Sequence, residues 1–429
     1  MLSASNVISV KEWIPPMNAS LLRAHADAIV AASIKAVLPD EAVRRALTGR
    51  SFPGRVFLVA TGKAAWQMAA AAVDCMPSIE RGVVVTKYDH VRAPIANCIC
   101  FEAGHPVPDE NSFIGTQAAI DLVTGLTETD TVLFLISGGG SALFEKPLIP
   151  AEELQDITRQ LLACSADIVE INTIRKRLSA VKGGRFAQLC APAKVLSIVL
   201  SDILGDPLDM IASGPAYPDS ATREDAIAIA EKYSLKLSAQ ARALLDNETP
   251  KALDNVETHV NGSVRELCAA AAQAASDLGY KPVMLTDQLC CQAKEAGSFL
   301  ASIVKTHADT KEPLAFIAGG ETVVQLIGKG LGGRNQELAL AAAAGIAGIP
   351  GAAVFSVGSD GTDGPTDAAG GYADWETAAA LKAHGLTVHG VLQNNDAYNA
   401  LKQVDGLIMT GPTGTNVNDV AAALIWPEV

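Results

Sequence analysis

Short apolar runs recur along this chain, each followed by a turn rich in glycine, serine or aspartate and then by a helical stretch. The runs have the length of buried strands, and their alternation with helices predicts a parallel sheet covered by helices on both faces. The clearest runs in the first half cover residues 55–60, 82–86, 131–136 and 195–201. The fold class that follows is α/β.

The chain has 429 residues, more than one ordinary domain holds. It begins with an Ala-rich segment, residues 20–48, that has the spacing of one helix. Between residues 222 and 255 the composition shifts to charged helices, and a second series of strands and helices follows, with a strand expected at 322–327. We therefore predict two domains, residues 1–235 and 236–429.

The net charge is −14, so a basic surface for nucleic acid is not expected. A chain this acidic that binds anionic metabolites must gather its lysines and arginines locally. No apolar stretch approaches the roughly 20 residues of a membrane span, and the segment around Lys11 lacks the apolar run of a signal peptide. The eight cysteines lack zinc-site spacing and are expected to be free thiols. These features predict a cytoplasmic protein that binds neither nucleic acid nor membranes.

Three glycines between two serines follow the strand expected at residues 131–136. In open α/β sheets, ligands bind at the carboxyl ends of strands, where the backbone N–H groups of the next helix are free. Glycine lets an anion come close to that backbone. We therefore predict a phosphate-binding turn, with a tight turn without ligand as the alternative; its residues are Ser137, Gly138, Gly139, Gly140 and Ser141.

Basic residues gather at two places in the first half of the chain. Lys63 follows the first core strand and opens a helix, where the helix dipole disfavours a cation unless the cation serves a ligand. The segment 172–185 is strongly basic, and its Arg175 and Lys182 lie about two helical turns apart, so they would share one face of a helix. A solvated helix surface is the alternative interpretation of both places.

Aspartates follow two further strands, Asp202 after one and Asp360 and Asp363 after the other. Carboxylates beside phosphate-binding turns suit Mg²⁺, which takes one or two protein carboxylates and completes its shell with phosphate and water. Asx turns are the alternative. The Walker A lysine motif and the H-R-D and D-F-G sets of protein kinases are missing from the sequence, which excludes those families.

Residues 328–334 contain the spelling G-x-G-x-x-G followed by Arg334, between an expected strand and an expected helix. This spelling is typical of dinucleotide binding. The first acidic residue at a later strand end, Asp360, is rather distant for the ribose role, and an arginine occupies the place where a pyrophosphate site presents bare backbone. The pattern therefore favours phosphate contact through Arg334 over a nicotinamide cofactor.

Nine segments, in order and over nearly the whole chain, resemble the MOFRL-type glycerate 2-kinases, a family whose members are also called hydroxypyruvate reductases. The segments are Gly62–Ala65, Gly104–Pro108, Ser137–Ser141, Lys182–Arg185, Ser201–Pro207, Ser213–Pro215, Gly332–Glu337, Ser359–Pro365 and Thr413–Asp419.

The resemblance implies a Rossmann-like parallel α/β/α N-terminal domain, a smaller α/β C-terminal domain and an active site in the cleft between them. It implies ATP-dependent phosphorylation of D-glycerate to 2-phosphoglycerate with a divalent metal, Mg²⁺. Lys63 and Arg334 match the family's catalytic pair and would neutralise charge on the transferred group. Because the two residues come from opposite halves of the chain, the reaction would need the domains to close.

In this scheme the Ser137–Ser141 turn, Gly332 and Gly333 contact ATP, while Asp202 or Asp363 holds Mg²⁺ or orients the substrate hydroxyl. The candidates for binding glycerate are Arg175, Lys182 and Asn335. Two other functions stay open, namely NAD(P)H-dependent reduction of hydroxypyruvate and a sensor that binds phosphorylated metabolites without turnover. A homodimer and a monomer are both compatible with the sequence.

Overall fold

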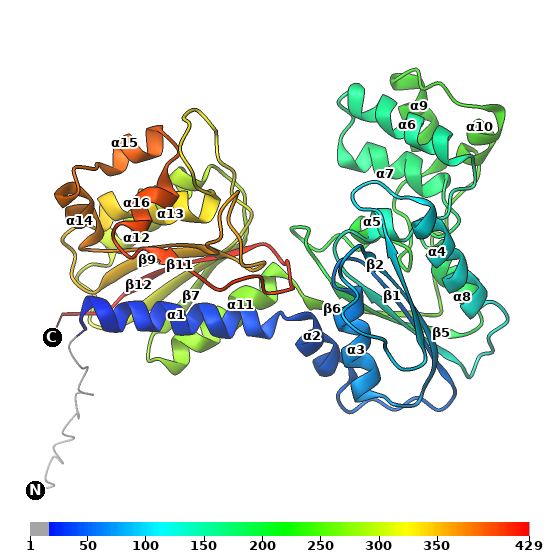
Figure 1. Cartoon of the computed structure of the whole chain (residues 1–429), viewed down its shortest axis with the longest axis horizontal. Helices are drawn as coiled ribbons and strands as arrows, with labels where there is room; N and C mark the ends of the chain where they lie inside the picture. Colours follow the sequence, from blue (N-terminus) through cyan, green and yellow to red (C-terminus); the bar gives the residue numbers. More distant parts are fainter. Residues whose placement is uncertain (1–16, 429) are drawn as a thin grey trace, which may run out of the picture.

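The computed structural model describes residues 17–428, so the segment around Lys11 lies outside the described residues. Two six-stranded sheets form the centres of two domains, which lie side by side in Figure 1. In the described part of the chain, no helix is both long enough and apolar enough to cross a bilayer.

The first sheet is parallel throughout and has the strand order β3-β2-β1-β4-β5-β6. This confirms the Rossmann-like N-terminal domain. The order reverses between β1 and β4, and the carboxyl ends of strands at such a point form the ligand crevice of this fold. The strands are β1 Val56–Thr61, β2 Ile79–Lys87, β3 Cys98–Ala103, β4 Thr131–Ile136, β5 Lys194–Leu200 and β6 Val256–Gly262.

Helices cover both faces of this sheet because side chains alternate along its strands. In β1, Leu58 and Ala60 belong to the apolar cluster under α2 and α3, while Phe57 and Val59 belong to the cluster under α4 and α8. These helices are α2 Pro39–Leu47, α3 Ala65–Cys75, α4 Glu110–Val123 and α8 Arg185–Cys190.

A separate group of helices packs around its own apolar core and stands above the first sheet in Figure 1. We call this group the helical lobe; it consists of α6 Ala151–Ala163, α7 Ile168–Arg177, α9 Arg223–Lys232 and α10 Ala239–Leu245. Two short elements connect the lobe to the sheet, the helix α5 Gly140–Leu143 and the 3₁₀ turn η1 Ile211–Ser213.

The second sheet is mixed and has the order β11-β10-β9-β12-β8-β7. Its β12 runs antiparallel to both β8 and β9, whereas β7 and β8 are parallel. The strands are β7 Lys281–Leu289, β8 Leu314–Gly320, β9 Ala352–Gly358, β10 Gly370–Asp374, β11 Leu407–Ile408 and β12 Asp419–Ile425. The helices of this domain are α11 Val264–Asp277, α12 Ala293–Thr306, α13 Arg334–Ile346, α14 Thr377–Ala383, α15 Val388–Gln393 and α16 Ala397–Lys402.

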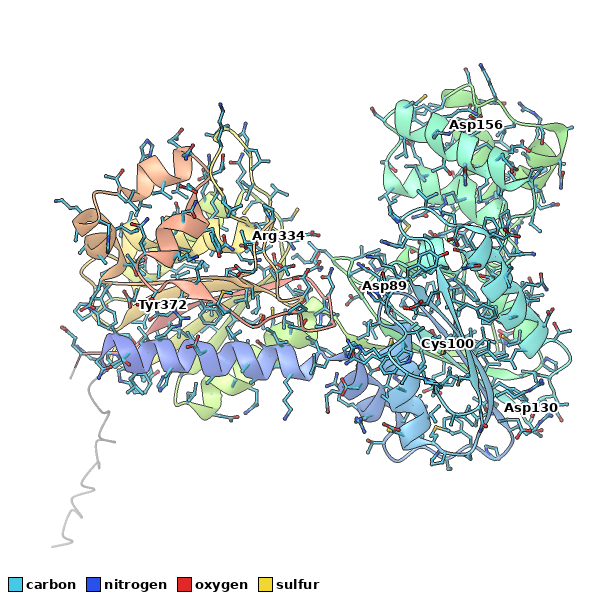
Figure 2. The ribbon with its side chains drawn as sticks, in the orientation of Figure 1. Asp89, Cys100, Asp130, Asp156, Arg334 and Tyr372 are labelled. Atoms are coloured by element: carbon cyan, nitrogen blue, oxygen red, sulfur yellow. The ribbon has the colours of Figure 1, made fainter. Side chains whose placement is uncertain are left out.

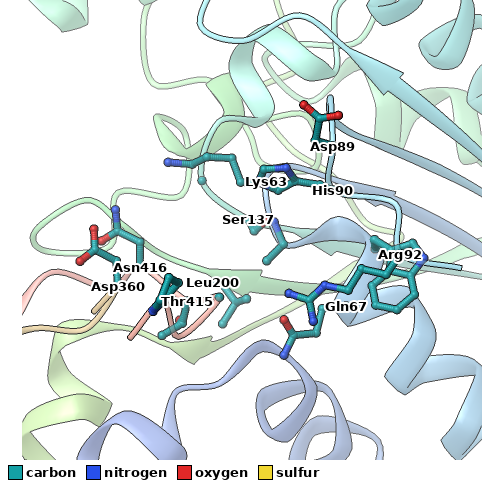
Figure 3. A pocket seen from close by; sticks show the side chains of 15 residues that line it. Lys63, Gln67, Asp89, His90, Arg92, Ser137, Leu200, Asp360, Thr415 and Asn416 are labelled. Carbon is teal, nitrogen blue, oxygen red and sulfur yellow. The ribbon is translucent and has the colours of Figure 1, made fainter. Parts of the chain in front are cut away.

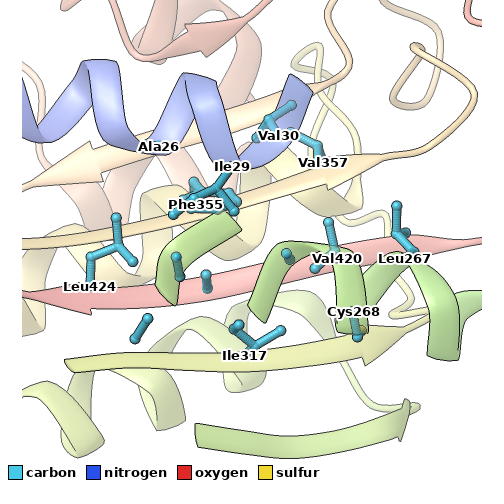
Figure 4. Close-up of a cluster of buried hydrophobic side chains, with 14 of the residues drawn as sticks. Ala26, Ile29, Val30, Leu267, Cys268, Ile317, Phe355, Val357, Val420 and Leu424 are labelled. Atoms are coloured by element: carbon cyan, nitrogen blue, oxygen red, sulfur yellow. The ribbon is translucent and has the colours of Figure 1, made fainter. Parts of the chain in front are cut away.

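The boundary between the two sheets differs from the junction predicted at residues 235 and 236. β6 pairs with β5 and completes the first sheet, so the second domain begins after residue 262. The first described helix, α1 Ala19–Ala36, also belongs to the second domain, because its Ile29 and Val30 pack in one cluster with Phe355 (Figure 4). The shift in composition near residue 235 marks the helical lobe and not a domain border.

Two local expectations are also wrong. The segment 20–48 forms two helices, because Pro39 begins α2 and cannot continue the hydrogen-bond ladder of α1. Residues 322–327 form no strand, and Leu326 and Ile327 are exposed. A short apolar run predicts a strand from sequence alone, but the strand forms only if a neighbouring strand pairs with it.

Candidate active site

Two turns meet at the point where the strand order of the first sheet reverses. The backbone N–H of Lys63, after β1, donates to the carbonyl of Gly138, after β4, at 2.9 Å. The backbone N–H of Ala64 donates to Oγ of Ser137 at 3.1 Å. The predicted lysine and the start of the predicted phosphate-binding turn therefore form one rigid unit.

A cleft of about 370 Å³ opens beside these turns and is lined from both domains (Figure 3). The first domain contributes Lys63, Trp66, Gln67, Arg92, Ser137 and Gly138. The second domain contributes Asp360, Gly414, Thr415 and Asn416. The loop before β12, quoted above only as part of the family resemblance, is thus a wall of the cleft.

Lys63 is half-buried in this cleft. Within residues 17–428 no carboxylate lies at ion-pair distance from its ammonium group. His105 lies beside Gly139, and burial, followed by the nearby Lys63, lowers the pKa of its imidazole. Sequence reasoning did not select His105 as a site residue, although its Gly-His-Pro context was the available signal.

Asp202, predicted as a catalytic or metal-binding residue, reaches the same place. Its carboxylate lies against Gly138, so a β-carbon at position 138 would collide with it. Burial raises the pKa of Asp202, while the positive charge of Lys63 opposes that rise. Glu321 of the second domain raises it further. Asp202 therefore stands between the glycine turn, a lysine and the facing domain.

Arg334, the predicted partner of Lys63, is the first residue of α13 on the second domain (Figure 2). Its Nε and Nη2 donate to the two oxygens of the buried Asp419 at 2.6 and 3.0 Å. Its Nη1 donates to Glu321 at 3.2 Å. Among the described residues, Arg334 does not line the cleft with Lys63, and the two residues belong to separate domains.

Asp363, the other predicted metal ligand, is buried behind the start of α13. Its carboxylate accepts the backbone N–H groups of Asn335 and Gln336 at 3.1 and 2.8 Å. Burial raises its pKa to about 6. These bonds satisfy two N–H groups that the first turn of a helix otherwise leaves free. The structure thus gives Asp363 a helix-capping role and no access to the cleft.

Replacing Asp363 with alanine should lower stability and leave the Mg²⁺ dependence of activity unchanged. Two buried N–H groups would lose their acceptor, at a cost of about 1–3 kcal/mol. Thermal melts should show the loss as a lower melting temperature. Asp363→Asn keeps one acceptor, so its melting temperature should lie between those of the natural protein and Asp363→Ala. A raised Mg²⁺ requirement in a variant of normal stability would contradict the capping role.

Asn335 is not available to a substrate either. It is buried, its Oδ1 accepts from Ser356 Oγ at 2.5 Å, and its amide donates to Asp363 at 3.3 Å. The G-x-G-x-x-G segment packs on the loop at residues 394–397, where β-carbons at Gly328 or Gly330 would collide with the backbone. Packing therefore accounts for these two glycines without a dinucleotide.

Most basic side chains of the segment 172–185 are buried and form their contacts inside the protein. Lys176 and Arg177 are buried and paired with Asp219. Lys182 is 0% exposed, and its ammonium donates to the carbonyls of Ser141 and Phe144 at 2.8 and 3.0 Å. Lys182 therefore supports the glycine turn from beneath and is not placed to bind a substrate, contrary to the prediction.

Glu145 accompanies Lys182 in this buried position. Its carboxylate lies 3.5 Å from Lys182 Nζ and 3.8 Å from Arg175 Nη2. Burial lowers the pKa of Lys182 to about 8, and Glu145 opposes the shift.

The titration of Lys182 should therefore add to the free energy of unfolding as pH rises, and Lys182→Met should remove this contribution. Between pH 8 and the ordinary lysine value of about 10.4, the unfolded chain keeps a proton that the folded protein has lost, so the free energy of unfolding increases with pH in this window. Chemical denaturation at pH 7.5 and 9.5 should show a larger increase for the natural protein than for the variant. Equal increases would mean that Lys182 titrates normally.

Of the predicted substrate residues, Arg175 is the one whose side chain stays partly exposed beside the glycine turn. Its Nη2 donates to the Ser141 carbonyl at 3.2 Å, and its side chain is 16% exposed. Beside it, Ser141 Oγ lies 2.9 Å from Ser213 Oγ, which donates to Asn172 at 3.1 Å. Ser213 has a left-handed backbone, with φ of 62°, a strained conformation of the kind that clusters at functional sites.

The described residues contain no group of three or more histidine, cysteine, aspartate or glutamate side chains that could hold a metal ion. Asp202 and Asp363, predicted as alternative ligands, do not come together. A divalent ion at Asp202 would need most of its remaining ligands from phosphate and water, and Mg²⁺ is commonly coordinated in this way.

Comparison with protein families gives two matches. Residues 25–246 match a domain of unknown function, DUF4147, and residues 314–419 match the MOFRL family. The first match contains the glycine turn and Lys63, and the second contains Arg334 and the cleft wall before β12.

Two relatives and one solved structure resemble the chain over most of its length. A Thermotoga maritima protein named D-glycerate 2-kinase is 53% identical over 404 residues, which cover 92% of this chain and 97% of the relative. A Pyrococcus horikoshii protein named glycerate 2-kinase is 40% identical over 425 residues, with 92% and 96% covered. A crystal structure of glycerate kinase from Thermotoga maritima, 52% identical, has a TM-score of 0.90 and covers 95% of this chain and 100% of that one.

Proposed function

Since this chain belongs to the MOFRL family of glycerate kinases, we propose that its interdomain cleft transfers the γ-phosphoryl group of ATP to the 2-hydroxyl of D-glycerate. The products are 2-phosphoglycerate and ADP. The observation that carries the proposal is a lysine at the start of α3 that has no carboxylate at ion-pair distance within residues 17–428, at the crevice of a Rossmann-like sheet and opposite a second domain.

The ATP phosphates lie at the start of α3, according to this proposal. Its N-cap residue, Ala64, has no polar side chain to accept the N–H groups of the first turn, and this turn lines the cleft. Free N–H groups and the positive end of the helix dipole favour an anion there. Lys63 adds a full charge at the same point, and Ser137 and Gly138 form the adjacent wall. Phosphoryl transfer depends mainly on such positioning and charge neutralisation.

Glycerate binds on the far side of the glycine turn in this proposal. Arg175 supplies a cation for its carboxylate, and the hydroxyls of Ser141 and Ser213 supply hydrogen bonds. A guanidinium is the geometric match for a carboxylate. Lys182 and Asn335 are left out of this subsite because both are buried.

Of the two candidates Asp202 and Asp363, Asp202 is the proposed Mg²⁺ ligand, because its carboxylate reaches the glycine turn. Bound there, Mg²⁺ would neutralise charge on the ATP phosphates. Asp202 is also the candidate to accept the proton of the substrate hydroxyl. Closure of the cleft would bring Arg334 to the transferred group and exclude water, which limits ATP hydrolysis.

A coupled assay with purified protein, ATP, Mg²⁺ and D-glycerate tests the activity. We expect 2-phosphoglycerate; 3-phosphoglycerate alone would refute the regiochemistry, and no product would refute the kinase. Oxidation of NADH with hydroxypyruvate would support the reductase instead, and ATP binding without turnover would support the sensor. Size-exclusion chromatography decides between monomer and homodimer, and fractionation of cells tests the cytoplasmic location.

A further inference from the structure

We propose that the end of the cleft formed by Trp66, Gln67 and Arg92 is the nucleoside subsite of the phosphate donor. This inference rests on the proposed kinase function, because it assumes that phosphates occupy the Lys63 end. It assigns a ligand class, a nucleoside triphosphate, to side chains that neither the sequence motifs nor the phosphate chemistry uses.

The size of the cleft is the first observation. Its volume of about 370 Å³ falls in the range of pockets that hold drug-sized ligands, which is far more than a triphosphate tail alone requires. Gln67 on α3 and Arg92 on the loop after β2 lie beyond Lys63 and Ser137 (Figure 3), and Trp66 precedes Gln67 on α3. A nucleotide with its phosphates at the start of α3 would extend its base in this direction.

The aromatic platform is the second observation. The guanidinium of Arg92 lies over the ring of Trp66, with its carbon 5.7 Å from the ring centroid. Within residues 17–428 no carboxylate pairs with Arg92, which is exposed although the chain carries a net charge of −14. Indole and guanidinium planes are the surfaces on which nucleobases stack, with little preference among bases.

The platform is fixed before any ligand arrives. Trp66 Nε1 donates to the carbonyl of Ala93 at 2.8 Å. The N–H groups of His90 and Val91 both donate to Glu102 Oε1 at 2.9 Å, which anchors the loop that carries Arg92 to β3. Such preorganisation lowers the entropic cost of binding.

Gln67 offers a polar contact at the edge of the platform. Its amide nitrogen donates to Asp40 at 3.1 Å, and this bond directs its oxygen toward Gly414 across the cleft. That oxygen is an acceptor suited to the exocyclic amine of adenine.

Calorimetry with ATP and with inorganic tripolyphosphate, both with Mg²⁺ and without glycerate, tests the subsite. The natural protein should bind ATP at least about tenfold more tightly than tripolyphosphate, since stacking of one base contributes on this scale. Trp66→Ala should weaken ATP binding about tenfold and Arg92→Ala about fivefold, with tripolyphosphate binding within about twofold of the natural protein. Trp66→Phe keeps a stacking surface and should stay within about threefold for ATP.

Arg159→Ala is the matched control, because this arginine lies on the helical lobe with a side chain 74% exposed. Equal weakening of both ligands would overturn the subsite, since it would mean that Trp66 and Arg92 serve the phosphates. Unchanged ATP binding in both variants would overturn it as well. A protein that shows the expected pattern but does not phosphorylate glycerate would refute the proposed function and keep the subsite.

Discussion

Replacing Lys63 with alanine should lower kcat for glycerate phosphorylation about 100-fold or more, which corresponds to about 2.7 kcal/mol of transition-state stabilisation. The lysine is half-buried at the cleft and, within the described chain, has no carboxylate at ion-pair distance, so its charge is free for the ligand. Its side chain is not part of an apolar core cluster, so the variant should fold normally. Initial rates at saturating ATP and glycerate measure the effect.

Lys382→Ala is a suitable control, because this lysine is exposed on α14, away from the cleft. Lys63→Arg should retain part of the activity, because the charge remains while its geometry changes. A rate near normal for Lys63→Ala would remove this residue from the mechanism. A loss confined to KM for ATP would reduce its role to ground-state binding.

Arg334→Ala should also lose more than tenfold in kcat, at least about 1.4 kcal/mol, and in addition should destabilise the protein. Removing the arginine leaves the carboxylate of Asp419 buried without its bidentate partner. Loss of one partner of a buried pair costs on the order of 3 kcal/mol, and less here because Arg334 is partly exposed. Thermal melts and initial rates should therefore both change.

The double variant Arg334→Ala/Asp419→Asn separates the two effects. Without the buried charge the stability should recover, while kcat should stay low if Arg334 acts on the transferred group. Recovery of kcat together with stability would show that Arg334 is only structural. Glu321→Ala offers an independent check, because it removes the acceptor of the Nη1 group of Arg334 and leaves the pairing with Asp419 intact.

Much of the fold follows from local patterns in the sequence. The strands at 131–136 and 194–200 are continuous apolar runs bounded by turn residues, and the structure keeps them within one residue of the prediction. β12 was not predicted, although residues 420–425 form a continuous apolar run, and its place between β8 and β9 at the centre of the second sheet has no local signal. Mixed pairing of this kind depends on residues far apart in the chain.

The site divides in the same way. Lys63, Ser137, Gly138 and Asp202 were identifiable because turn chemistry and position after a strand are local properties. The burial of Lys182 and Asp363 could not be predicted, because it depends on contacts made by distant segments. The stacking of Arg92 on Trp66, on which the proposed nucleoside subsite rests, could not be predicted either, since neither residue has a motif and their contact exists only in the fold.

That glycine-rich turns and charged side chains stand at the ends of buried strands follows from the order of residues alone, because apolar runs and turn residues act over a few neighbouring positions. Which of those charges remain free depends on how the distant segments pack together. The tertiary structure pairs Arg334 with Asp419, 85 positions away, and buries Lys182 under the glycine turn, while it leaves Lys63 open to the cleft. The reason is physical: burial and ion pairing are properties of the packed chain, and a charge that finds a carboxylate or a carbonyl inside the protein is not available to a ligand.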